Sequence, residues 1–214
     1  MTDEVTQRVA AALWEAAAKN GHVGLELEFR LGHRLPGGAF AANVGEDRWT
    51  TLRDRLNASK AFRRCDMDTV DAIYDHGYKC VTTTAYSDGP APPPHWIRKT
   101  KLAAVDYDVD GSPHCARAAL ASEQFAPAPD EAGLPDPRFN RVKYRHRYTW
   151  KCWAVDLTRV LSTLPDDLDN ADCSYEVEIE LLDTGMLFER TMDNIAAWGI
   201  SLVRDMVQLM TAQE

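Results

Sequence analysis

Two stretches of this chain alternate between apolar and charged residues, the pattern of a β-strand with one buried and one polar face. In residues 23–31 the alternating apolar and charged sets are Leu25, Leu27, Phe29 and Leu31 against Glu26, Glu28 and Arg30. In residues 174–182 they are Tyr175, Val177, Ile179 and Leu181 against Glu176, Glu178 and Glu180. Each strand needs a core on its apolar side, so its charged side needs a separate explanation.

The rest of the pattern predicts helices at both ends of the chain and strands between them. Helical apolar spacing covers residues 3–20, 47–56 and 187–210. Strand patterns cover residues 69–74, 78–85, 96–105, 114–124 and 141–155. The last of these is either one long strand or a hairpin, and Asp156 is expected to begin a new element. Together they predict an α+β fold with an antiparallel sheet of roughly eight strands.

Composition fits one domain, which we expect to span residues 1–214. The five cysteines are scattered without a CxxC pair, which is typical of free thiols in an intracellular protein. The first ten residues lack the apolar core of a secretory signal, and no stretch reaches the ~20 apolar residues of a membrane span. We therefore expect a protein of the nucleus or cytoplasm, including that of a virus-infected host cell, and neither a secreted nor a membrane protein.

Charge is segregated along the chain more than its net value of −9 suggests. That net value argues against a surface that grips duplex nucleic acid by general attraction. However, residues 138–151 carry six basic residues and no acid, whereas residues 166–180 carry acids and no base. Two such blocks in neighbouring elements indicate a site that handles an anion and a cation together.

The acidic faces of the two alternating strands are candidate metal ligands. Residues two apart on a strand lie on one face, ~6.6–6.8 Å apart, so Glu176, Glu178 and Glu180 point the same way. Like charges in a row are unfavourable unless a cation or basic groups offset them. Glu26 and Glu28 repeat the arrangement, and carboxylate oxygens are what Mg²⁺ or Mn²⁺ prefers. A solvated acidic surface is the alternative.

A basic strand supplies the counterpart. Arg141, Lys143, Arg145 and Arg147 share a face, and arginine presents a planar fork that matches phosphate oxygens. The four could follow a triphosphate, or they could be a solvated strand that contacts RNA backbone or balances the acidic faces. If all charged faces line a closed barrel, acidic and basic strands meet across a polyphosphate and its metal. The apolar faces would then pack outward under the terminal helices.

At this point the chain resembles a known family, the metal-dependent RNA 5′-triphosphatases of the fungal and large-DNA-virus mRNA-capping type, which are triphosphate tunnel metalloenzymes. The resemblance rests on an ordered set of segments that spans most of the chain. They are Glu26-x-Glu28-x-Arg30, residues 70–74 with 78–82 (VDAIY and YKCVT), residues 145–149 (RHRYT), residues 153–158 (WAVDLT) and residues 175–181 (YEVEIEL). The family's fold is an eight-stranded antiparallel tunnel, in agreement with the inward-facing arrangement.

The resemblance also implies roles for individual residues. The implied ligands of Mg²⁺ or Mn²⁺ are Glu26, Glu28 and Glu180. The implied catalytic group, which supports the metal and orients the attacking water, is Glu176, Glu178, Asp156 and Arg147. The implied phosphate contacts are Lys79, Arg98 or Lys99, Lys143, Arg145 and Arg147. Strand phase cannot choose between Arg98 and Lys99, and the basic strand could shift by two residues toward Arg141. The remaining implied tunnel-wall residues are Arg30, Glu123 and Arg141.

The implied reaction is hydrolysis of the γ-phosphate of a 5′-triphosphate RNA end to a diphosphate end, the first step of mRNA capping. Free nucleoside triphosphates are a further implied substrate. The chain has no lysine-nucleotidyl motif, so a separate guanylyltransferase is expected, and a homodimer stays open. Lys79 stands where the family usually has arginine, and lysine lacks the planar fork by which arginine makes two hydrogen bonds to one phosphate. The alternatives are a thiamine or inorganic triphosphatase of the same superfamily, a related cyclase-like enzyme, and a non-catalytic polyphosphate-binding capping module.

Overall fold

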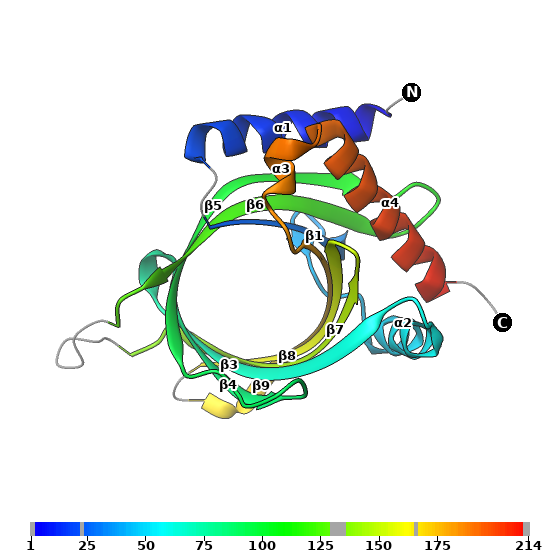
Figure 1. Ribbon diagram of the computed structural model, residues 1–214. Coiled ribbons are helices and arrows are strands. Elements are labelled where there is room, and N and C mark those ends of the chain that lie inside the picture. The colour runs from blue at the N-terminus through cyan, green and yellow to red at the C-terminus, as the bar shows by residue number, and fades with distance from the viewer. Residues whose placement is uncertain (1–2, 22–23, 129–135, 165–166, 212–214) are drawn as a thin grey trace.

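The computed structural model describes residues 3–21, 24–128, 136–164 and 167–211, and a closed antiparallel barrel forms its main body (Figure 1). Around the barrel the strands follow the order β1 (Leu25–Arg34), β6 (Cys115–Ala126), β5 (His95–Asp108), β4 (Tyr78–Tyr86), β3 (Arg63–Ile73), β7 (Phe139–Trp150), β8 (Trp153–Leu164) and β9 (Asp167–Leu181). Pairing of β9 with β1 closes the circle, and a short β2 (Phe40–Ala41) extends β1 outside it. The predicted α+β barrel is confirmed.

The register of the closing strands brings the charged sequences together. Glu28 on β1 lies opposite Glu180 on β9, and Arg30 lies opposite Glu178. On the other side of β9, strand β8 places Asp156 opposite Glu178. The basic strand β7 is the next neighbour of β8. Both acidic strands and the basic strand therefore form one continuous part of the barrel wall.

The hydrophobic core lies outside the barrel, between its wall and the helices. Many outward-facing side chains of β1, β6, β8 and β9 are fully buried, for example Leu27, Phe29, Leu120, Leu157 and Ile179. Helix α1 (Glu4–Asn20) packs on β5 and β6, and α4 (Met192–Thr211) packs on β1 and β9 (Figure 1). Helix α2 (Glu46–Ala58) packs on β9 and α4, while the short α3 (Met186–Glu189) leads into α4. This burial explains why apolar faces can point away from a polar interior.

One close contact fixes α4 on the strand that carries the first two glutamates. A Cβ atom on Gly199 would lie 2.2 Å from Cε2 of Phe29, so only glycine lets the helix approach this near. Phe29 lies between Glu28 and Arg30 in sequence and points outward while they point inward. Packing of α4 thus positions the polar face of β1.

The element boundaries correct several sequence expectations. Helices α1 and α2 are where the apolar spacing predicts them, but the C-terminal pattern is divided into α3 and α4, with the Thr191 hydroxyl accepting from the Asn194 amide. Residues 141–155 belong to a hairpin that turns at Lys151, whose φ is 53°. Asp156 does not begin an element, because β8 already starts at Trp153. Strand β3 starts at Arg63, earlier than predicted, and β2 was not predicted.

None of the helices in the described ranges combines the length and the apolar character that a membrane crossing requires.

Candidate active site

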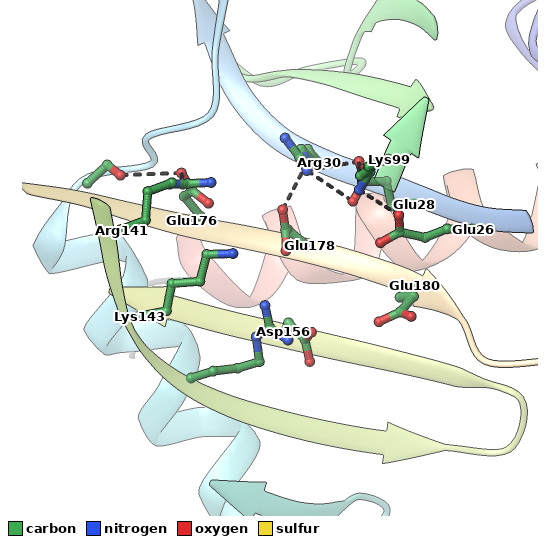
Figure 2. A network of polar contacts seen from close by, with 12 residues as sticks. Glu26, Glu28, Arg30, Lys99, Arg141, Lys143, Asp156, Glu176, Glu178 and Glu180 are labelled. Carbon is green, nitrogen blue, oxygen red and sulfur yellow. Dashed lines mark hydrogen bonds and ion pairs between the residues drawn. The ribbon is translucent and has the colours of Figure 1, made fainter. Parts of the chain in front are cut away.

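Three carboxylates from β1 and β9 gather at one end of the charged interior (Figure 2). Each is held by a basic group. Nζ of Lys99 lies 2.5 Å from Oε2 of Glu26 and 3.8 Å from Oε1 of Glu28. Nη2 of Arg30 lies 2.9 Å from Oε1 of Glu28, and Arg147 contacts Glu180. The ammonium of Lys99 thus stands between two of the predicted metal ligands, where a cation is electrostatically favoured.

The surroundings raise the pKa values of two of these carboxyl groups. Burial raises the pKa of Glu28, and the nearby Glu178 and Glu26 add to the effect, although Arg30 opposes it. Burial likewise raises the pKa of Glu180 to about 7, against the pull of Arg147, and Asp156 and Glu26 contribute. Both carboxyl groups are therefore easier to protonate than a free glutamate, because burial removes the water that stabilises their charge.

Glu178, in the middle of the acidic row, behaves in the opposite way. Its Oε1 lies 2.9 Å from Nε of Arg30. Burial alone would raise its pKa, but Arg30, Arg145 and Lys143 together lower the pKa to about 2. Glu178 therefore carries a negative charge at neutral pH.

All four inward-facing basic side chains of β7 form salt bridges with acidic side chains inside the barrel. Nη2 of Arg141 donates to Glu176 at 2.7 Å, and Nζ of Lys143 lies 2.5 Å from Oδ2 of Asp71. Nε of Arg145 lies 3.5 Å from Oδ2 of Asp156. Arg147 donates twice to Asp156, from Nε at 2.8 Å and from Nη2 at 2.7 Å. The four basic side chains of β7 are thus paired with inward-facing acids of three strands, β3, β8 and β9.

Two hollows follow one another along the barrel. The basic hollow, about 390 Å³ in volume, is lined in the described structure by seven basic and two acidic side chains. These are Arg30, Lys79, Lys99, Lys101, Arg117, Arg141 and Lys143 with Glu28 and Asp71. The acidic hollow, about 220 Å³, is lined by Glu26, Glu123 and Glu180 and by no basic side chain among the described residues. The interior is thus divided by charge along its length.

The structure distinguishes the two basic candidates on β5. Lys99 points into the barrel, next to Glu26, whereas Arg98 is exposed outside it with its guanidinium 5.5 Å from the ring centre of Tyr78. Strand alternation requires this, because neighbouring residues occupy opposite faces. Arg98 is therefore not brought to the predicted phosphate contacts. Lys79 does point inward, and its Nζ lies 3.4 Å from Oε2 of Glu123.

Three inward charges had no role in the sequence analysis. Asp71 is almost fully buried and accepts from the Thr69 hydroxyl besides pairing with Lys143. Lys101 and Arg117 line the basic hollow. Asp71 lies in the VDAIY segment, and its isolated charge in an apolar strand was the available signal. Lys101 shares a face with Lys99, two residues away on β5, so alternation was the available signal for it. Arg117 is a single charge in an alanine-rich part of β6 and gave little signal.

Comparison with known proteins agrees with this arrangement. The sequence profile of the family described as "mRNA capping enzyme, beta chain" matches residues 62–202, which is well over half of the chain. The 5′RNA triphosphatase A449R of Paramecium bursaria Chlorella virus 1 is 32% identical over 186 residues, covering 86% of this chain and 88% of the relative. This chain belongs to that capping-enzyme family. The resemblance drawn from the glutamate strands is thereby confirmed.

Solved structures with the same fold come from a yeast and a virus. The S. pombe Pct1 RNA triphosphatase has a TM-score of 0.78 at 17% identity and covers 97% of this chain and 93% of its own. The Mimivirus capping enzyme triphosphatase has a TM-score of 0.59 at 14% identity and covers 97% and 99%. At such low identity these likenesses concern the fold, a triphosphate tunnel.

A divalent metal fits the donor set of this family member but not its present side-chain arrangement. Within the described ranges, no group of three or more His, Cys, Asp or Glu side chains is already close enough to hold a metal. The oxygen donors of Glu26, Glu28 and Glu180 are nevertheless those that hard divalent ions prefer. Raised pKa values at Glu28 and Glu180 and the ammonium between Glu26 and Glu28 both indicate a place for positive charge. Binding would require Lys99 and Arg147 to release their carboxylates.

Proposed function

We propose that this protein is a metal-dependent RNA 5′-triphosphatase that removes the γ-phosphate from a 5′-triphosphate end, the first step of mRNA capping. The observation that carries the proposal is the adjacency of a basic hollow and a cluster of three carboxylates inside one barrel. A basic hollow alone would bind many anions, and carboxylates alone would bind a cation. Their combination suits a polyphosphate with its metal. Membership of the capping-enzyme family supports the same substrate.

Glu26, Glu28 and Glu180 would hold Mg²⁺ or Mn²⁺. When bound, the ion supplies charge neutralisation at the γ-phosphate and lowers the pKa of a coordinated water. With the carboxylates satisfied by the ion, Lys99 and Arg147 would be free to contact phosphate oxygens. Two basic groups that now neutralise acids would then neutralise the substrate.

The remaining residues of the interior would position the reacting groups. Glu178, which stays ionised, would accept a hydrogen bond from the attacking water and orient it toward the γ-phosphorus. A bond forms between the water oxygen and phosphorus, and the bond to the bridging oxygen breaks, giving inorganic phosphate and a diphosphate end. Asp156 and Glu176 hold Arg147 and Arg141 in fixed orientations, so the equatorial oxygens meet donors already in place. Lys79, Lys143 and Arg145 would complete the contacts along the chain of phosphates.

The product defines the next step. A diphosphate RNA end is the acceptor for nucleotidyl transfer, so a separate guanylyltransferase would act on it inside the cell. A homodimer, which the sequence leaves open, is not required by this reaction.

A substrate panel tests the proposal. The purified protein is given triphosphate-ended RNA, inorganic triphosphate and thiamine triphosphate with Mg²⁺ or Mn²⁺, and the rate of phosphate release is measured with each. We expect release from the RNA to leave a diphosphate end. A preference of several orders of magnitude for thiamine triphosphate would contradict the capping assignment. The absence of release from all three substrates would favour a non-catalytic capping module.

A further inference from the structure

Three side chains in or just outside the wall of the basic hollow take no part in the reaction proposed above. Tyr78 and Lys101 line the hollow, and Lys101 is exposed to solvent. Arg98 lies over the Tyr78 ring at 5.5 Å, outside the barrel wall. Within the described structure neither Arg98 nor Lys101 has an ion-pair partner, whereas nearly all other basic groups of the hollow are paired. Tyr78 therefore joins two exposed basic side chains that form no salt bridge in the described structure: it borders the hollow that Lys101 lines, and its ring contacts Arg98 outside the wall.

The charge of the two hollows sets the direction of a bound triphosphate. Its γ-phosphate belongs next to Glu28, which borders the basic hollow, with Glu26 and Glu180 beyond it. The other phosphates then extend into the basic hollow, because the opposite direction would place them beside Glu26, Glu123 and Glu180. The RNA carries one further negative charge per nucleotide, which the basic hollow is likewise better suited to accept. The nucleoside must consequently leave the barrel past the basic edge.

We propose that Tyr78, Arg98 and Lys101 form a rim subsite that binds the first nucleotides of a triphosphate-ended RNA outside the tunnel; this rests on the proposed function. The Arg98 guanidinium and the Tyr78 ring, whose centre lies 5.5 Å from it, are planar groups on which an unpaired base can stack. Lys101 offers a point charge to the phosphodiester that follows the triphosphate. Inorganic triphosphate has neither a base nor a phosphodiester, so stacking on Tyr78 and Arg98 and the phosphodiester contact of Lys101 are available only to RNA.

Binding measurements test the rim subsite separately from hydrolysis. The variants R98E and K101E are made in the full chain, and the affinity for 3′-labelled, triphosphate-ended RNA is measured by fluorescence anisotropy with a chelator present. We expect each variant to weaken RNA binding about tenfold, the effect of one charged contact. For R98E, whose side chain lies outside the barrel, the affinity for inorganic triphosphate, measured by calorimetry, should stay within about twofold of wild type. K101E changes a residue that lines the basic hollow, so it should weaken the binding of inorganic triphosphate as well, but less than the binding of RNA.

The chain provides a matched control. Arg159 lies over the ring of Tyr144 at 5.7 Å on the outer wall of β8 and β7, the same pair of side chains away from the rim. R159E makes the same charge change and should leave RNA affinity unchanged. A general effect of net charge would instead weaken binding in R159E as much as in R98E, and would overturn the rim subsite.

Phe125 tests the opposite direction, in which the RNA strand would leave the barrel at the acidic hollow. Its side chain is 85% exposed at the acidic hollow, next to His95. If F125A weakens RNA binding while R98E and K101E do not, the strand leaves by the acidic end and the inference is wrong. Equal losses for RNA and inorganic triphosphate in R98E and K101E would also overturn it. Phosphate release by the wild type is scored separately, so RNA binding that depends on the rim without any release would refute the proposed function alone.

Discussion

At the scale of single residues, the two hydrogen bonds from Arg147 to Asp156 are the most specific feature of the basic strand. Lysine at this position keeps the charge but cannot make both bonds. We expect R147K to lower kcat/KM on triphosphate-ended RNA about 10- to 100-fold, in line with ~1.5–3 kcal/mol for a charged hydrogen bond. R53K is the matched control, because Arg53 donates twice to Asp54 on the exposed face of α2. Equal rates for R147K and wild type would show that positive charge alone suffices.

A buried histidine gives a pH-dependent prediction for stability. Burial lowers the pKa of His114 below its ordinary 6.5, and Arg48 adds to the effect. The folded protein therefore binds fewer protons at this site than the unfolded chain, and the contribution of His114 to stability is lost as pH falls below 6.5. H114Q should show a smaller drop in the free energy of unfolding between pH 7.5 and 5.5, measured by urea denaturation. An unchanged drop would exclude His114 as its source.

Residue pairs were the least predictable part of the site. Alternation along β5 shows that Arg98 and Lys99 face opposite ways, but not which of them faces inward. The pairing of Lys143 with Asp71 joins residues 72 positions apart and depends on the register of β3 and β7. Sequence pattern gives faces of strands, whereas register comes from the three-dimensional pairing.

At the scale of elements, the sequence was most informative where one face is buried. The alternating strands β1 and β9 and the amphipathic α1 were predicted, because each has a clear apolar side. The turns and breaks within elements were not predicted. The hairpin at Lys151 and the interruption before α4 depend on single residues within otherwise continuous patterns. The polar lumen was inferred only because both acidic strands and the basic strand needed to face one another.

Helix α4 supplies the prediction at this scale. In G199A the new methyl group would overlap the Phe29 ring, and α4 would have to move away from β1. We expect a loss of about 1–3 kcal/mol in the free energy of unfolding, the usual cost of overpacking a core. The control is S201A on the exposed side of the same helix, with an expected change within about 0.5 kcal/mol. A G199A protein as stable as wild type would mean that the contact between α4 and β1 can adjust freely.

At the scale of the whole molecule, the core and the chemistry occupy different sides of one barrel wall. Helices cover the outer apolar faces, so the interior can be given over to charge. The net charge of −9 does not describe the surface that a substrate meets, since the basic hollow and its rim are locally positive. This division explains how an acidic protein can accept a polyanion.

The measurement closest to the central claim is phosphate release from triphosphate-ended RNA with and without a divalent metal. We expect wild type to release the γ-phosphate with Mg²⁺ or Mn²⁺ and to stop when the metal is chelated. E28Q should lose at least about 100-fold in rate because it replaces a negatively charged carboxylate ligand by a neutral amide, whereas E15Q, a change on the exposed side of α1, should match wild type. Release that persists in chelator, or an E28Q protein as fast as wild type, would contradict the account.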